Sequence, residues 1–173
     1  RSIVIKGSTT GSPKTLEDDF KKLFEKGGPE SQTSTAFFKI MNHSVPANVA
    51  MAVDYSGPLL STGSACSTSS QAMIQAWEMI QSGLYDIAIV GGADEAYYTS
   101  AAIFDTVQAA STNYNDQPNE SPRPFDSKRD GLVISEGAGI VVMESEAHMK
   151  ARGAKPLAEF VGGAYYCDGQ HMS

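Results

Sequence analysis

Apolar positions in the N-terminal third of the chain form one strand-like run and two helix-like patterns. Residues 2–5 (Ser-Ile-Val-Ile) predict a buried strand that ends in a turn-rich loop. Residues 16–26 predict a helix with Gly27 as its C-cap, because large apolar side chains recur on one face: Leu16, Phe20, Leu23 and Phe24. A loop rich in Gly, Pro, Ser and Thr follows over residues 27–36. Residues 45–53 predict a second, largely buried helix that holds a proline in its first turn.

The centre of the chain has the clearest pattern. A strand begins at Leu59-Leu60 and leads toward Cys66, and residues 67–82 then predict a helix. One stripe of this helix is apolar: Met73, Ala76, Trp77 and Ile80. Residues 86–90 are a continuous apolar strand, closed by Gly91-Gly92. Strand, helix and apolar strand make a βαβ unit, so we expect the two strands to be parallel and covered on both faces, in an α/β fold.

The C-terminal third combines a long loop with further short elements. Residues 111–131 are polar, hold three prolines and predict one long surface loop. Residues 132–143 return to a β pattern around Gly137-Ala138-Gly139, and residues 146–152 predict a short helix. Residues 157–161 predict another strand.

Composition and charge narrow the class of protein. The chain has 173 residues, of which 41% are hydrophobic, and 13 Lys plus Arg stand against 20 Asp plus Glu, for a net charge of −7. An acidic chain without a basic cluster is a poor nucleic-acid binder, because neutralising phosphates dominates that affinity. Its apolar runs are far shorter than the ~20 residues that span a bilayer, and its start lacks a signal-peptide pattern. We therefore expect a cytoplasmic protein without a membrane span.

Cys66 is the candidate catalytic residue, because it lies where the strand passes into the helix. A thiol at a helix N-terminus faces the positive end of the helix dipole, which favours the thiolate nucleophile. The backbone amides there can stabilise an oxyanion on an acyl group that the sulfur attacks, and the small neighbours leave room for a substrate carbonyl. The alternative is a buried structural cysteine in a turn of small residues.

Other candidate groups have simpler structural interpretations. Gly7-Ser8-Thr9-Thr10-Gly11 resembles a nucleophile elbow but has no assignable partner, which favours a turn. Gly137 and Gly139 are better read as close-packing strand glycines than as a dinucleotide fingerprint. The long loop holds a charge cluster that we expect to pin it against the sheet: Arg123, Asp126, Arg129, Asp130 and Glu136. His148 is expected to be a solvated helix position, and Cys167 has no helix start. No metal spacing and no cofactor motif is present in the sequence.

Several motifs, in order and spacing, resemble those of the β-ketoacyl-acyl-carrier-protein synthases of the thiolase-like superfamily. They are Ser64-Ala65-Cys66-Ser67-Thr68-Ser69, Asp86-Ile87-Ala88-Ile89-Val90-Gly91-Gly92-Ala93-Asp94-Glu95, Arg123-Pro124-Phe125-Asp126, Arg129-Asp130-Gly131, Glu136-Gly137-Ala138-Gly139, Lys150-Ala151-Arg152-Gly153-Ala154 and Asp168-Gly169-Gln170-His171-Met172. The resemblance is dense over residues 57–173 and looser before that. The stretch from Arg123 to Gly139 is similar to the elongating and polyketide-type synthases.

The resemblance implies a layered αβαβα thiolase-like fold, of which residues 1–173 form one partial domain, mostly the first half. It implies that Cys66 accepts an acyl chain from a carrier-protein thioester, after which a decarboxylated malonyl unit attacks in a Claisen condensation. The implied partners are acyl carrier protein, acyl and malonyl thioesters, and a second subunit in a homodimer or heterodimer.

The family's two catalytic histidines lie C-terminal to the region present here, and His171 does not correspond to either of them. We therefore expect this chain to be a fragment or one portion of a longer enzyme. The alternative hypothesis is a non-catalytic subunit or scaffold half that keeps the thiolase-like surface for dimerisation; the presence of Cys66 favours the enzyme.

Overall fold

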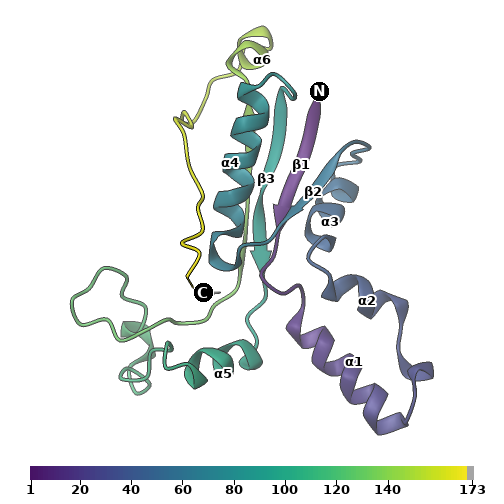
Figure 1. The fold of residues 1–173 in the computed structure, drawn as a ribbon, viewed down its shortest axis with the longest axis vertical. Helices are drawn as coiled ribbons and strands as arrows, with labels where there is room; N and C mark the ends of the chain where they lie inside the picture. Colours follow the sequence, from purple (N-terminus) through teal and green to yellow (C-terminus); the bar gives the residue numbers. More distant parts are fainter. Residues whose placement is uncertain (171–173) are drawn as a thin grey trace. The chain divides into compact units, whose positions relative to one another are not determined.

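The computed structural model describes residues 1–170, and their contacts divide the chain into two compact units (Figure 1). The sheet unit consists of Arg1–Gly11, Met41–Ala93 and the chain from Ala138 onward. The helical unit consists of Ser12–Ile40 and Asp94–Gly137. The single partial domain expected from the resemblance stays a prediction. In the part of the chain that is described, no helix is long and apolar enough to cross a membrane.

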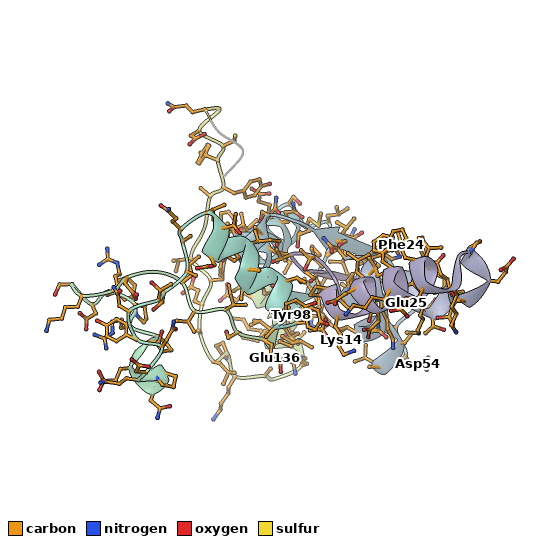
Figure 2. The ribbon with its side chains drawn as sticks, turned by 90° about the horizontal axis from the view of Figure 1, so that it is seen from below. Lys14, Phe24, Glu25, Asp54, Tyr98 and Glu136 are labelled. Atoms are coloured by element: carbon orange, nitrogen blue, oxygen red, sulfur yellow. The ribbon has the colours of Figure 1, made fainter. Side chains whose placement is uncertain are left out.

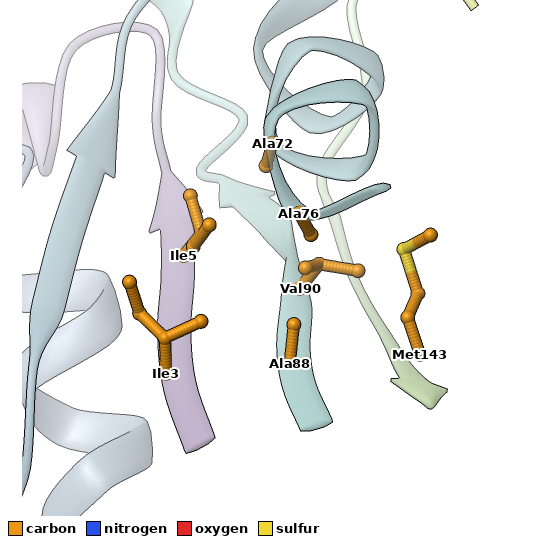
Figure 3. Packing of buried hydrophobic residues seen from close by; sticks show 7 residues of the cluster. All are labelled: Ile3, Ile5, Ala72, Ala76, Ala88, Val90 and Met143. Carbon is orange, nitrogen blue, oxygen red and sulfur yellow. The ribbon is translucent and has the colours of Figure 1, made fainter. Parts of the chain in front are cut away.

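The sheet unit is built on four strands in the order β2-β1-β3-β4. These are β1 (Ser2–Gly7), β2 (Leu59–Thr62), β3 (Ile87–Asp94) and β4 (Gly137–Glu144). Strand β1 pairs in parallel with β2 on one side and with β3 on the other, so Ile5 lies opposite both Leu60 and Val90. The predicted parallel βαβ unit is therefore confirmed, with β1 inserted between its two strands. Strand β4 runs in the opposite direction at the edge (Figure 3).

Helix α4 (Thr68–Gln81) covers one face of this sheet because small residues let it approach closely. The core cluster under it consists of Ile3, Ile5, Ala72, Ala76, Ala88, Val90 and Met143 (Figure 3). Met73, Trp77 and Ile80 of the predicted apolar stripe pack against that cluster and are partly buried. The predicted helix and its core-facing stripe are thus confirmed, although the most deeply buried helix positions are alanines.

Helix α3 (Ser44–Ala52) lies on β1 and β2, and its bounds are within a residue of the prediction. It is not largely buried as predicted, since Met51 is 71% exposed. Val4 alternates with the core residues of β1 and is fully buried, so α3 covers the face opposite α4. Pro46 and Ala50 are the buried residues of α3. The Tyr55 hydroxyl, just beyond the helix, donates to the Ser2 carbonyl at 2.7 Å.

Lys6 is a buried lysine in the middle of the sheet, which the sequence pattern did not reveal. Its side chain is 1% exposed, and its ammonium group donates to the Gly139 carbonyl at 3.3 Å. A Cβ at Gly91 would lie 2.0 Å from that same carbonyl oxygen and 3.2 Å from the Lys6 side chain, so only glycine fits there. Burial lowers the pKa of Lys6, because desolvation disfavours its charged form.

Two strand predictions in the sheet unit are wrong. Strand β3 does not close at Gly91-Gly92 but continues to Asp94, because these glycines let Gly139 and Ser69 approach its backbone. Residues 157–161 form no strand, since the segment lies along α4 instead of pairing with a sheet edge (Figure 1). Phe160 packs on Trp77 at 6.2 Å between ring centroids.

The helical unit contains α1 (Pro13–Lys26), the short helix η1 (Pro29–Ser31), α2 (Ser34–Ile40), α5 (Tyr98–Thr106) and the short helix η3 (Pro118–Glu120). Helix α1 starts at a Ser12 N-cap that accepts a hydrogen bond from the Thr15 amide, and it ends at Gly27 with φ +70° as predicted. The Glu95 carboxylate accepts hydrogen bonds from the Ser12 hydroxyl at 2.8 Å and from the Lys14 amide at 3.3 Å. The negative charge of this carboxylate interacts favourably with the positive end of the α1 dipole.

Helix α2 was missed, because the predicted loop over residues 27–36 overlaps its start. Thr33 acts at that start through its carbonyl, which accepts from the Ala36 amide at 3.0 Å. Thr and Ser are typical both of loops and of helix N-termini, so a helix of seven residues is hard to separate from a loop.

The long polar loop over residues 111–131 is folded on itself. The Asp130 carboxylate accepts from the Ser111 hydroxyl at 2.6 Å and from the amides of Thr112 and Asn113 at 2.9 and 2.8 Å. These hydrogen bonds, the one from Ser111 first, lower the pKa of Asp130. The guanidinium of Arg123 lies 3.8 Å from the centroid of the Tyr114 ring. The charge cluster therefore has structural partners as expected: Asp130 and Arg123 make their contacts within the loop, whereas Glu136 accepts from the Ala96 amide, just after β3, at 3.3 Å.

Candidate active site at Cys66

The backbone around Cys66 changes from strand to helix within five residues. Strand β2 ends at Thr62, the one-turn helix η2 (Ala65–Ser67) follows, and α4 begins at Thr68. Cys66 is the middle residue of η2, and its side chain is exposed. Ala65 has φ +47°, in the left-handed region that a residue with a Cβ rarely adopts, at a cost of about 1 kcal/mol or more. The junction predicted for Cys66 is present, with a strained residue directly before the thiol.

Two buried threonine hydroxyls hold this junction together. Thr68 is 3% exposed; its hydroxyl accepts from the Ser64 amide at 3.0 Å and donates to the Ala65 carbonyl at 2.7 Å. Thr62 is 5% exposed, and its hydroxyl donates to the Thr68 carbonyl at 3.2 Å. These hydrogen bonds connect the backbone before Cys66 to the first turn of α4, and that turn to the end of β2.

Glycines at the carboxyl ends of the neighbouring strands let the first turn of α4 sit close to the sheet. A Cβ at Gly7, the last residue of β1, would lie 2.1 Å from the Thr62 carbonyl oxygen and 2.6 Å from the Thr68 methyl group. A Cβ at Gly92 would lie 2.5 Å from the Ser69 hydroxyl. Gly7 therefore requires glycine, because the Thr62 carbonyl belongs to the backbone. A Cβ at Gly92 would require the Ser69 hydroxyl to turn away and would lie 3.1 Å from the Gly7 carbonyl oxygen. Three parallel strands thus converge on the turn that carries Cys66.

The first turn of α4 has no side-chain cap. The N-cap residue of α4, Ser67, makes no side-chain hydrogen bond to the helix. A helix N-terminus without a side-chain cap presents amides and a positive dipole end to its surroundings. An exposed thiol at this place is suited to act as a nucleophile on a carbonyl carbon, with backbone amides near the developing oxyanion. The catalytic role of Cys66 stays a prediction.

The other sequence candidates lie elsewhere or have structural partners. Cys167 is an exposed free thiol in the segment after α6 (Glu146–Ala151), and its sulfur accepts from the Gly169 amide at 3.3 Å. The residues from Gly7 to Gly11 form a turn, in which the Gly11 amide donates to the Ser8 hydroxyl at 3.0 Å. Among residues 1–170, no group of three or more His, Cys, Asp and Glu side chains could hold a metal ion.

His148 lies in α6 with its side chain 39% exposed, which agrees with the expected solvated helix position, and it also pairs with Glu144 at the end of β4. Arg152 donates to both oxygens of the same carboxylate at 2.7 Å. The hydrogen bonds from Arg152 and His148 lower the pKa of Glu144 to about 2. Ser145 donates to the Asp86 carbonyl at 2.8 Å, which places α6 at the amino end of β3, whereas Cys66 follows the carboxyl end of β2 (Figure 1). His171 lies outside the described residues.

Gly137 and Gly139 have open space where their own Cβ atoms would be. Both glycines lie in β4, which confirms that they belong to a strand. The close packing predicted for them is wrong. The close approach there belongs to Gly91, which faces the Gly139 carbonyl.

Sequence reasoning identified Cys66 but missed the groups that hold it, namely Thr62, Thr68, Gly7 and Gly92. Thr68 lies two residues after Cys66 at the start of α4, and a polar residue at the first position of a helix was a usable signal for a capping role. The two glycines follow apolar strand runs, which is where a backbone often approaches another element.

Comparison with known proteins assigns this fold and junction to a class. The chain matches the family model described as "Beta-ketoacyl synthase, N-terminal domain" over residues 3–148. Since this match covers most of the chain, the protein belongs to the β-ketoacyl synthase family, through its N-terminal domain. The α/β fold is that of the thiolase-like ketosynthases, as the resemblance implied.

Two similar proteins support the family assignment. The chain is 42% identical over 137 residues to 3-oxoacyl-[acyl-carrier-protein] synthase 1 of Haemophilus influenzae, covering 79% of this chain and 34% of that protein. It is 37% identical over 169 residues to the synthase of the same name from Escherichia coli K12, covering 98% of this chain and 42% of that protein.

A beta-ketoacyl synthase from Burkholderia phymatum STM815 superposes with a TM-score of 0.80 and 41% identity over 90% of this chain and 38% of that one. The ishigamide ketosynthase/chain length factor superposes with a TM-score of 0.72 and 28% identity over 90% of this chain and 37% of that one. The chain therefore spans well under half the length of these relatives.

Proposed function

We propose that the complete protein is a β-ketoacyl-acyl-carrier-protein synthase and that Cys66 is its acyl-accepting nucleophile. The observation that carries the proposal is the exposed thiol of Cys66 at the strand–helix junction of a chain belonging to this family. The names of the relatives support the reaction class, an acyltransferase of fatty acid biosynthesis. The same chemistry extends chains in polyketide biosynthesis.

In the proposed reaction, the Cys66 thiolate attacks the carbonyl carbon of an acyl thioester on acyl carrier protein. The thioester C–S bond breaks, the carrier thiol leaves with a proton, and an acyl-cysteine remains. A malonyl thioester then loses carbon dioxide, and the electron pair of the broken C–C bond forms a carbon nucleophile. This carbon attacks the acyl-cysteine, a new C–C bond forms, and the Cys66 thiolate is released together with a β-ketoacyl thioester.

The proposed assembly is a dimer with a second copy or a homologous chain. Strand β2 supports it, because β2 is an edge strand of the sheet and leads directly to Cys66. An unpaired strand edge is a ready template for another strand. The cytoplasmic location stays a prediction. A non-catalytic scaffold is not favoured, because the relatives are named as synthases and the chain keeps Cys66.

The experiment uses the complete protein, a radiolabelled acyl-carrier substrate and the variants Cys66→Ala and Cys167→Ala. We expect label on the wild type and on Cys167→Ala, and none on Cys66→Ala. Release of carbon dioxide from the malonyl substrate should persist in Cys66→Ala, because that step does not need the sulfur. Acyl label retained by Cys66→Ala would identify another nucleophile and overturn the proposal.

A further inference from the structure

The backbone before Cys66 carries a strained residue, Ala65, and one side chain binds the backbone before and after it. Ala65 has φ +47°, and the hydroxyl of Thr68 contacts the chain on both sides of it. The Ser64 amide donates to this hydroxyl at 3.0 Å, and the hydroxyl donates to the Ala65 carbonyl at 2.7 Å. A threonine hydroxyl has one proton to donate, so its donor is fully used here.

Thr68 is itself buried and held by two further contacts. Its side chain is 3% exposed, its carbonyl accepts from the Thr62 hydroxyl at 3.2 Å, and its methyl group lies against Gly7. A hydroxyl held this firmly can impose a conformation on the residues that it binds. Alanine disfavours positive φ, so a contact that holds Ala65 in this conformation stabilises the junction.

We propose that Thr68 is a positioning residue for Cys66, whose hydroxyl holds the left-handed Ala65 and so presents the thiol to the acyl carbonyl. The inference rests on the proposed function, since it concerns the same sulfur. Thr68 acts on the thiol indirectly, through the backbone of residues 64 and 65.

Two substitutions of Thr68 separate the contribution of its hydroxyl from that of its methyl group. Thr68→Val keeps the size and the methyl group, but it leaves the Ser64 amide and the Ala65 carbonyl without their partner. Thr68→Ser keeps the hydroxyl and removes the methyl group. If the hydroxyl positions Cys66, serine should retain the function and valine should lose it, although valine is the closer match in shape.

The test measures acyl transfer to Cys66 in the complete protein over a range of acyl-carrier substrate concentrations that reaches saturation. We expect Thr68→Val to lower the rate constant of acylation by roughly 10- to 100-fold with little change in KM, because a small misplacement of a nucleophile has effects of that size. Thr68→Ser should stay within a few-fold of wild type. Alkylation of Cys66 by iodoacetamide should fall much less in Thr68→Val, since a small reagent reaches a thiol in many orientations.

A second comparison uses Ala65→Gly. Glycine adopts positive φ without strain, so the loss caused by Thr68→Val should be smaller in the Ala65→Gly background. If Thr68→Val does not fold, Thr68→Ala is used in both backgrounds in its place.

Three results would overturn the proposal: wild-type acylation in Thr68→Val, equal losses in the serine and valine variants, or no coupling with Ala65→Gly. Cys66→Ala separates this inference from the proposed function. If Cys66→Ala is not acylated while Thr68→Val behaves as wild type, only the positioning role fails. If Cys66→Ala is still acylated, the proposed function fails, and the positioning role fails with it.

Discussion

Gly7 and Gly63 both adjoin Thr62, but they differ in the room around them. Gly7 pairs with Thr62 across the sheet, and a Cβ there would lie 2.1 Å from the Thr62 carbonyl oxygen. Gly63 follows Thr62 in the chain, and a Cβ there would have nothing within 4 Å. These two glycines therefore offer a matched pair for testing how tightly the Cys66 junction is packed.

We expect Gly7→Ala to lower the free energy of unfolding of the complete protein by about 2 kcal/mol or more, because the added methyl group must push β2 or α4 away. Gly63→Ala should change it by less than about 0.5 kcal/mol. Denaturant titration measures both values. Acylation of Cys66 should fall in the Gly7 variant, since the displaced groups are those that hold the junction. Equal stabilities for the two variants would show that the junction is loosely packed.

For single residues, the sequence predicted the position of Cys66 but not the groups that hold the backbone around it. A cysteine between an apolar strand run and a helical pattern is visible in one dimension. The hydroxyl contacts of Thr68 depend on the left-handed conformation of Ala65, and alanine has no preference for it that a sequence pattern could show. Lys6 was missed for a related reason: its burial results from the space over Gly91, on a neighbouring strand.

Among the elements, α1 and α5 are joined by one carboxylate. Glu17 of α1 accepts a hydrogen bond from the Tyr98 hydroxyl at 2.5 Å and pairs with Lys21, and Tyr98 lies beside α1 (Figure 2). The hydrogen bonds from Lys21, Tyr98 and Tyr97 lower the pKa of Glu17 to about 2. The same contact raises the pKa of Tyr97 to about 12, since the phenol donates to an anion.

This pairing predicts a pH dependence of stability with a defined sign. A folded-state pKa below the unfolded value of 4.5 means that Glu17 stabilises the fold fully above about pH 4.5 and progressively less as the pH falls toward 2. The difference in free energy of unfolding between wild type and Glu17→Gln should therefore be largest at neutral pH and shrink between pH 5 and pH 3. Chemical denaturation of the complete protein at several pH values measures it.

Glu25→Gln is the control for this prediction, because it removes the same charge from the same helix at an exposed position. Its stability should follow the wild-type pH profile. A pH profile of Glu17→Gln that runs parallel to that of the wild type would contradict the assigned pairing.

The ends of helices were predictable where the sequence pattern was local. The order in which strands pair in the sheet was not predictable. The helix after Cys66 begins at Thr68 and ends at Gln81, within a residue of its predicted limits, because its apolar stripe and the following glycine are local signals. The insertion of β1 between β2 and β3 joins residues more than fifty positions apart, and no local pattern contains it. Residues 157–161 have strand-like composition, but a strand forms only where another strand offers its backbone.

On the scale of the whole chain, apolar surface stays uncovered on the sheet unit. Ile140 and Val142 lie on one face of β4 and are 56% and 60% exposed. In the segment after α6, Leu157 and Val161 are also largely exposed. Exposed apolar patches on this scale mark interaction surfaces. The edge position of β2 adds an unpaired strand to the same unit.

The 173-residue chain expressed alone should therefore associate. We expect light scattering to report a mass above that of the 18.4 kDa monomer, rising with protein concentration, because burying apolar area is favourable whenever a second surface is available. Replacing Ile140 and Val142 together by Lys should shift the distribution toward the monomer, since lysine on an exposed strand opposes pairing and removes apolar area. Val53→Lys, at an exposed valine just after α3, is the control for the added charge and should change the association less. A stable monomer with a cooperative unfolding transition in the unmodified chain would show that these faces need no partner.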